Sequence, residues 1–203
     1  MARFHGKRAA SLRDSGCDVI AFETVPVAAE AEAIAKALDE TVRHPAWISF
    51  SCASASTLCS GEPLAEGVRK ALKSPHVVGV GINCSRPEYC ASLLAIARAE
   101  VERASATVTV GREDKGEGRV VRLLVYPNSG EDWDAERRCW VIATRDSSDG
   151  SGAAAAGETR AACDGKSLAD MVPDWMAQGA TLIGGCCRVG PDDIRAIAEK
   201  VGW

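Results

Sequence analysis

Short apolar runs rich in Val and Ile alternate with longer amphipathic segments along this chain. Such runs carry few charges and are typical of strands buried in a parallel sheet. The segments between them repeat apolar residues at helical spacing. Strands are expected at 18–23, 46–52, 77–84, 121–126 and 180–185, and helices at 27–42, 62–73, 87–103, 168–178 and 191–201. This alternation predicts βαβ units around a parallel sheet, which is the α/β class.

Two segments interrupt the alternation. Residues 107–119 contain a charged, glycine-rich stretch, and residues 144–166 contain a Ser/Asp/Gly stretch followed by four alanines. Both are expected to be solvated loop insertions. An element of the same series follows each loop, so residues 1–203 are expected to form a single domain.

Composition and charge exclude some classes of function. The net charge of −4 implies no nucleic-acid surface. No apolar stretch reaches the ~20 residues that span a bilayer, and the first residues have no apolar core of a secretory signal. A cytoplasmic location is therefore expected. The nine cysteines are expected to be metal ligands, catalytic groups or core residues rather than disulfides.

Three cysteines stand at the ends of apolar runs. Cys84 ends one run, and Cys186 and Cys187 end the last one. Thiols at the same end of two parallel strands can converge, and three cysteines with an open fourth position suit catalytic zinc. Taken alone, a cysteine such as Cys84 at a strand end is usually a small core residue, and the adjacent pair could equally be ligands or core. The other six cysteines are expected to be core or surface thiols.

The order of several motifs carries a resemblance. They are Phe22-Glu23-Thr24-Val25-Pro26, Trp47-Ile48-Ser49-Phe50-Ser51, Gly81-Ile82-Asn83-Cys84, Tyr126-Pro127-Asn128-Ser129-Gly130-Glu131 and Gly184-Gly185-Cys186-Cys187-Arg188. On these motifs the chain resembles the homocysteine S-methyltransferase family, in the branch that uses S-methylmethionine or S-adenosylmethionine. The resemblance covers nearly all the chain except the two loops.

The resemblance implies a fold and a site. The family folds as a (β/α)8 TIM-type barrel with zinc at its C-terminal face, and its thiolate ligands match Cys84, Cys186 and Cys187. Its acidic residue after the fourth strand matches Glu23, which would pair with the substrate ammonium. Asn128 follows a strand and is expected to line the site. The alternatives are a salt-bridged rim residue for Glu23 and an ordinary turn for residues 126–130.

The resemblance also implies an incomplete barrel. Five expected strands stand against eight, and 203 residues against ~250 in a typical barrel. Strands 4–8 are expected to be present and strands 1–3 missing, so that the chain matches about the C-terminal five-eighths of the family's homocysteine-binding domain. Two sheet edges would stay unpaired, which offers a route to self-association.

The expected reaction is zinc-dependent methyl transfer from a sulfonium to the thiol of L-homocysteine, giving methionine, with small molecules as the partners. A free thiol has a pKa near ~8.5, so binding to zinc would supply the thiolate. Three protein thiolates keep electron density on that sulfur. One alternative is an impaired fragment that keeps the zinc ligands but lacks a complete substrate pocket. Another is a redox-responsive protein that uses Cys186 and Cys187. Adjacent cysteines form a disulfide only with difficulty, because its geometry is strained.

Overall fold

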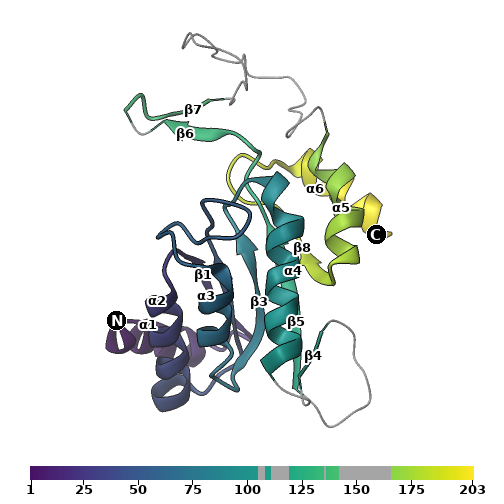
Figure 1. Ribbon diagram of the computed structural model, residues 1–203. Helices are drawn as coiled ribbons and strands as arrows, with labels where there is room; N and C mark the ends of the chain where they lie inside the picture. Colours follow the sequence, from purple (N-terminus) through teal and green to yellow (C-terminus); the bar gives the residue numbers. More distant parts are fainter. Residues whose placement is uncertain (105–107, 111–118, 135, 142–165) are drawn as a thin grey trace.

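The computed structural model describes residues 1–104, 108–110, 119–134, 136–141 and 166–203 (Figure 1). Its elements in chain order are α1 (Ala2–Asp14), β1 (Ile20–Val25), α2 (Ala28–Ala37), the π-helical turn η1 (Leu38–Val42), β2 (Ala46–Phe50), α3 (Leu64–Ala71), β3 (Val77–Asn83), α4 (Pro87–Ala104), β4 (Val108–Val110), β5 (Arg119–Tyr126), β6 (Asp132–Asp134), β7 (Cys139–Val141), α5 (Leu168–Ala177), β8 (Ala180–Ile183) and α6 (Pro191–Val201).

The strands form one parallel sheet and a small antiparallel hairpin. Strands β1, β2, β3 and β5 are neighbours in that order, and every pair is parallel. Strand β4 pairs with the first residues of β5, and β8 pairs with its last residues. All five expected strands are present and parallel, so the α/β prediction is confirmed.

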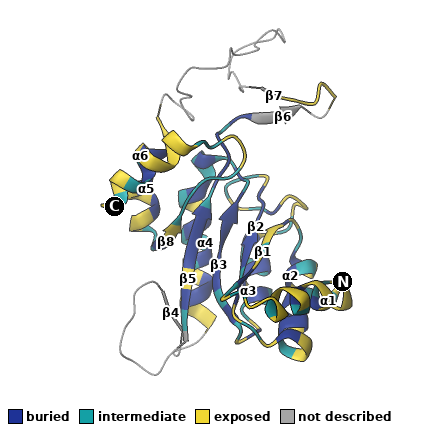
Figure 2. Ribbon diagram, turned by 180° about the vertical axis from the view of Figure 1, so that it is seen from behind, coloured by how far each residue is buried: buried dark blue, intermediate teal, exposed yellow. Residues whose placement is uncertain are grey.

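One face of the sheet is covered by helices and holds the main core. Helices α2, α3 and α4 lie against this face in Figure 1, and Figure 2 shows the strands from the opposite side. Alternate strand residues pack under the helices and are almost fully buried: Ile20, Ile48, Phe50, Val80, Ile82, Leu123 and Val125. Burial of these side chains supplies the main driving force for docking the helices onto the sheet.

The opposite face of the sheet is covered only in part. Two glycines in β3 leave room for their neighbours, since a Cβ on Gly81 would lie 1.9 Å from the carbonyl oxygen of Leu124 and one on Gly79 would lie 3.1 Å from Trp47. The side chain of Leu124 is therefore only 1% exposed, whereas Leu182 in β8 is 42% exposed. On this face, the residues of β3 and β5 at the centre of the sheet bury one another, whereas β8 at its side is exposed to solvent.

The predicted loop at 107–119 is wrong at both ends. Val108–Val110 forms β4, which pairs with the start of β5, and Arg119 already belongs to β5. The β-branched residues Val108, Thr109 and Val110 favour extended backbone, and this preference prevailed over the polar composition that follows. Residues 111–118 lie outside the described residues. So do residues 142–165, which make up nearly all of the second predicted loop.

Two further features were not expected from the pattern. The helix predicted at 27–42 ends in the π-helical turn η1, which Arg43 terminates in a left-handed conformation (φ 47°). A hairpin formed by β6 and β7 follows β5. Its strands have three residues each, which is too short for a periodicity to reveal.

The sheet is open over the residues that the structure describes. Strand β1 pairs with β2 only, and β8 pairs with β5 only. The carboxyl ends of the parallel strands β1, β3, β5 and β8 lie on the same side of this sheet. This carboxyl edge is where the candidate functional residues gather. No helix in the described parts of the chain is long and apolar enough to cross a membrane.

Candidate metal centre

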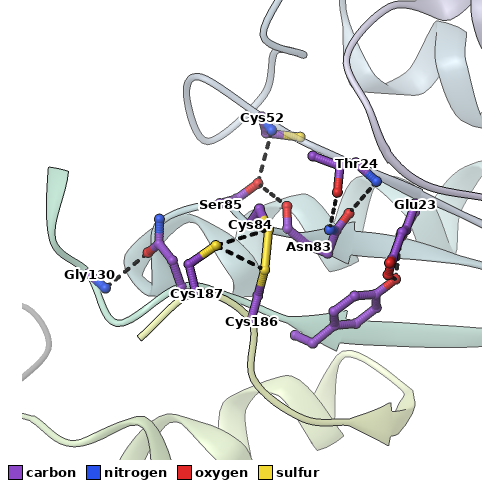
Figure 3. Close-up of a disulfide and its surroundings, with 12 residues drawn as sticks. Glu23, Thr24, Cys52, Asn83, Cys84, Ser85, Gly130, Cys186 and Cys187 are labelled. Carbon is purple, nitrogen blue, oxygen red and sulfur yellow. Dashed lines mark hydrogen bonds between the residues drawn. A yellow bond between two sulfur atoms is a disulfide. The ribbon is translucent and has the colours of Figure 1, made fainter. Parts of the chain in front are cut away.

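Three cysteine sulfurs converge at the carboxyl ends of β3 and β8. Cys84 directly follows β3, and Cys186 and Cys187 follow β8 after two glycines. The three sulfurs lie within 4.8 Å of one another. The Cys187 sulfur is 3.9 Å from that of Cys84 and 3.7 Å from that of Cys186, and Cys84 and Cys186 are joined as a disulfide (Figure 3). The structure thus brings together the three residues named as ligands.

The arrangement fits a thiophilic metal such as zinc. Tetrahedral zinc with bonds of ~2.3 Å holds its ligand sulfurs ~3.8 Å apart, which agrees with both distances from Cys187. The disulfide between Cys84 and Cys186 differs from the expectation that the cysteines are metal ligands, catalytic groups or core residues rather than disulfides. A bonded pair offers no thiolate, so Cys84 and Cys186 must be reduced before they can bind a metal. The convergence that suits a metal also brings two sulfurs into bonding contact.

The backbone bends sharply where Cys84 is presented. Cys84 has φ 47°, and Thr24 in β1 has φ 62°. The buried side chain of Asn83 connects these two bends, because its Oδ1 accepts from the Thr24 amide at 2.9 Å and its Nδ2 donates to the Thr24 hydroxyl at 2.7 Å. Asn83 therefore holds the end of β1 against the end of β3, beside the first ligand.

A tight turn presents Cys186 and Cys187. The Val189 amide donates to the Cys186 carbonyl at 3.3 Å, so the chain doubles back directly after the two cysteines. A Cβ at Gly185 would lie 2.1 Å from Cγ1 of Val189. Since real Cβ atoms never approach so closely, glycine is needed at this position for the turn to close.

Glu23 lies at the same edge and receives a hydrogen bond. It is exposed, and its Oε2 accepts from the Tyr126 hydroxyl at 3.2 Å. The Tyr126 oxygen is 2.5 Å from the buried Ser49 hydroxyl. Burial raises the pKa of Tyr126 to about 12, so its hydroxyl stays protonated at neutral pH. Among the described residues no cationic side chain lies within 4.0 Å of the Glu23 carboxylate. The alternative that Glu23 is a salt-bridged rim residue therefore finds no partner in that part of the chain.

Asn128 lies inside the loop that follows β5. Its side chain is 9% exposed, and its Oδ1 accepts from the Gly130 amide at 2.9 Å. Its own amide donates to the Ser85 carbonyl at 3.2 Å. These contacts support the loop next to the cysteines, and substrate contact by Asn128 stays a prediction.

Sequence reasoning assigned no site role to Ser49, Glu131 or Arg188, and within residues 126–130 it preferred Asn128 to Tyr126. Tyr126 and Ser49 meet only because β2 and β5 lie on either side of β3, and Glu131 and Arg188 meet across two loops. All four residues stand inside the motifs that carried the resemblance, which was the one available signal.

The remaining cysteines agree with the expectation of core or surface thiols. Cys52 and Cys90 are buried, Cys17 is partly buried, and Cys59 and Cys139 are exposed. Burial raises the pKa of Cys52 to about 12 and raises that of Cys90 as well. Cys163 lies outside the described residues.

A parallel α/β sheet with three cysteines at the carboxyl ends of two strands defines the class: an α/β protein with a candidate thiolate metal centre. The family model for homocysteine S-methyltransferase matches residues 1–201. The chain therefore belongs to the homocysteine S-methyltransferase family.

Curated relatives and solved structures agree with this assignment. The chain is 35% identical to homocysteine S-methyltransferase 2 of Arabidopsis thaliana, over 98% of this chain and 49% of that protein. It is 36% identical to selenocysteine Se-methyltransferase of Brassica oleracea var. italica, over 98% of this chain and 47% of that protein. The apo structure of the homocysteine methyltransferase MmuM from Escherichia coli matches with a TM-score of 0.66 and 32% identity, over 98% of this chain and 55% of that one. A metallated form of MmuM matches with a TM-score of 0.66 and 30% identity, over 98% of this chain and 52% of that one.

The chain spans about half the length of the curated relatives it matches. The residues of this chain that match the family model, 1–201, include the three cysteines, Glu23 and the loop after β5.

Proposed function

We propose that this chain carries the metal site and part of the substrate site of an enzyme that methylates homocysteine. The convergence of three cysteine sulfurs within 4.8 Å at the ends of β3 and β8, in a member of this family, carries the proposal. The methyl donor is S-methylmethionine or S-adenosylmethionine, and the product is methionine.

The fold proposed for the whole enzyme is a (β/α)8 barrel. In this assignment β1, β2, β3, β5 and β8 are strands 4–8, and the unpaired edges of β1 and β8 meet further strands that close the sheet. The face that carries Ser49 and Leu124 then becomes the barrel interior, with the cysteines at its C-terminal end, where barrel enzymes place their active sites.

Zinc is the proposed metal, held by Cys84, Cys186 and Cys187 in their reduced form. When bound there, it supplies a Lewis acid that lowers the pKa of a substrate thiol. Three thiolates around a divalent cation leave a formal charge of −1, which limits how strongly electron density is drawn from a sulfur nucleophile. The need for reduced ligands favours a reducing compartment such as the cytoplasm.

The protein side chains hold the amino acid part of the substrate. Glu23 is the proposed partner of the homocysteine ammonium, since it is an exposed carboxylate at the sheet edge that holds the cysteines. Tyr126 donates to its Oε2 and so limits the rotation of the carboxylate. A fixed carboxylate loses less entropy when it binds an ammonium than a mobile one does.

The reaction is a methyl transfer between two sulfur atoms. The homocysteine sulfur forms a bond to the methyl carbon as the bond from that carbon to the donor sulfonium breaks. The sulfonium becomes a neutral thioether, and the thiol proton of homocysteine goes to solvent. The positively charged leaving group needs no acid to depart.

Metal content and turnover test the proposal. The reduced chain should bind one zinc, measured by elemental analysis, and Cys84→Ser, Cys186→Ser and Cys187→Ser should each lose most of it. Cys59→Ser, which changes an exposed thiol outside the site, is the control. Full zinc retention in a variant that carries both Cys186→Ser and Cys187→Ser would contradict the metal site.

A second candidate is a zinc-binding fragment without turnover of its own. The open sheet of the described residues favours it, because part of the barrel wall is absent from that sheet. Methyl transfer to homocysteine by the chain alone separates the two candidates.

A further inference from the structure

We propose that Glu131 and Arg188 act as positioning residues, forming a clasp that holds the turn bearing Cys186 and Cys187 in place for the metal. The inference rests on the metal site proposed above and adds two side chains that are not among its three cysteine ligands. The clasp joins the loop after β5 to the loop after β8.

The carboxylate of Glu131 is buried and receives two donors on one oxygen. Its side chain is 5% exposed, and its Oε2 accepts from Nε of Arg188. The same oxygen accepts from the Ser129 hydroxyl at 2.8 Å. A buried carboxylate is costly unless it is paired and hydrogen-bonded, so Glu131 holds Arg188 firmly.

Arg188 directly follows the second cysteine of the turn, in a left-handed conformation with φ 61°. Non-glycine residues rarely adopt this conformation, and it persists where the surroundings impose it. The pairing of Arg188 with Glu131 is such a constraint. Holding the guanidinium therefore also holds the backbone next to Cys187.

Backbone hydrogen bonds show that the loop after β5 lies between the two ligand-bearing segments. The Pro127 carbonyl accepts from the Cys186 amide at 2.7 Å, and the Ser129 amide donates to the Cys187 carbonyl at 3.1 Å. Toward β3, the Tyr126 carbonyl accepts from the Cys84 amide at 3.2 Å.

Residues 126–131 thus form hydrogen bonds to both cysteine-bearing segments and set the distance between Cys84 and the two adjacent cysteines. The clasp joins Glu131, at the end of this segment, to Arg188 in the turn. Outer partners of metal ligands typically change metal affinity by about 10- to 100-fold when they are removed, and the same range is expected here.

A plain stabilising ion pair is the competing explanation, and the chain contains a matched control. Glu100 in α4 is also 5% exposed, with Arg69 at 3.3 Å and Arg103 in direct contact. Glu100→Gln removes an equally buried, arginine-paired carboxylate that is not part of the loops bearing the cysteines. General loss of stability should affect both variants alike.

The test measures zinc affinity of the full, reduced chain by competition with a chromophoric chelator. Glu131→Gln and Arg188→Gln are each expected to weaken zinc binding by about 10- to 100-fold. The double variant should lose no more than either single one, because the two side chains act as a unit. Cobalt in place of zinc should show weaker thiolate charge-transfer absorption in both single variants. Glu100→Gln should stay within about twofold of the unchanged chain.

Hydrogen exchange provides a reading that does not depend on metal. In the reduced, metal-free chain, Glu131→Gln should speed exchange of the Cys186 amide, which donates to the Pro127 carbonyl, while amides within β3 keep their rates. If Glu131→Gln does not fold, Arg188→Lys carries the test, since it keeps the charge but removes the Nε contact, and it should weaken zinc binding in the same direction.

The outcomes separate the inference from the proposed function. If the chain without substitutions binds no zinc after reduction, the proposed metal site is wrong. The exchange rate of the Cys186 amide then tests the clasp independently of the metal. Zinc affinity in Glu131→Gln within about twofold of the unchanged chain, or an equal loss in Glu100→Gln, overturns the clasp.

Discussion

Single side chains set the chemistry at the carboxyl edge of the sheet. The side chains of Ser49, Tyr126 and Glu23 form a hydrogen-bonded series that leads from the buried Ser49 in β2 to the exposed Glu23 in β1. Since burial raises the pKa of Tyr126 to about 12, its hydroxyl remains a donor across the physiological range. This hydrogen bond limits the rotation of the Glu23 carboxylate, which is the proposed partner of the substrate ammonium.

Replacing Glu23 by Gln should weaken homocysteine binding and leave zinc in place. A hydrogen bond to a charged group contributes about 1.5–3 kcal/mol, which corresponds to about ten- to a hundredfold in affinity. The KM for homocysteine in a version with a complete barrel is the measurement, with zinc content as the control. Tyr126→Phe should cause a smaller change in the same direction. Unchanged KM and kcat in Glu23→Gln would mean that Glu23 is a rim residue.

Thiol reactivity should follow burial among the cysteines outside the site. The thiolate is the reactive form, and burial raises the pKa of Cys52 to about 12, so its thiolate fraction is small at pH 8 and grows only as the pH approaches that value. Cys59 is exposed and should react with iodoacetamide at least about tenfold faster than Cys52 or Cys90. Peptide mapping by mass spectrometry checks this, and equal rates under native conditions would show that the core opens readily.

Strands and turns decide where those side chains can meet. The glycines of β3 let β2 and β5 bring Trp47 and Leu124 close together across it, and Gly185 lets the cysteine turn double back on Val189. These are properties of neighbouring elements in contact, and they explain why glycine stands at each of these positions.

Gly81→Ala should destabilise the chain strongly, because its Cβ would lie 1.9 Å from a backbone oxygen of β5 and the two strands would have to separate. Overpacking of this kind typically costs about 1–3 kcal/mol, and the contact with backbone places it at the upper end. Gly184→Ala is the matched control, since its nearest neighbour would be 3.7 Å away. Chemical denaturation measures both variants, and equal midpoints would contradict the packing assigned to β3.

At the scale of the whole molecule, the open sheet is the dominant feature. Strand β1 keeps one edge without a strand partner among the described residues, and Leu182 is 42% exposed on the uncovered face. Free edges and exposed apolar side chains favour association between chains.

The chain expressed alone should therefore self-associate and show little methyl transfer. A chimera that adds the first three strand–helix units of a relative should become monodisperse and active, because those strands would pair with the free edges and complete the pocket. Sedimentation velocity and a homocysteine methylation assay measure the two properties. A monodisperse monomer of 203 residues with turnover equal to that of full-length relatives would show the strand assignment to be wrong.

Local pattern was enough to predict the main strands and to single out the three cysteines that the structure brings together. Val and Ile runs located all five main strands, and the motifs around Cys84 and Cys186-Cys187 named the metal site, because strand periodicity and residue type are properties of short segments. The same local reasoning missed β4, where three β-branched residues preceded a charged stretch.

Only the tertiary structure decided which distant groups meet. Glu131 and Arg188 are 57 residues apart, and Tyr126 and Ser49 are 77 apart, so no local pattern connects them. Their contacts follow from the order of strands in the sheet and from the paths of the loops at its carboxyl edge. The sequence by itself determined the main α/β elements and placed three cysteines after the ends of two strands. The sheet determined how the three thiols, the carboxylate and the clasp are placed in space, because parallel strands bring together ends that lie far apart along the chain.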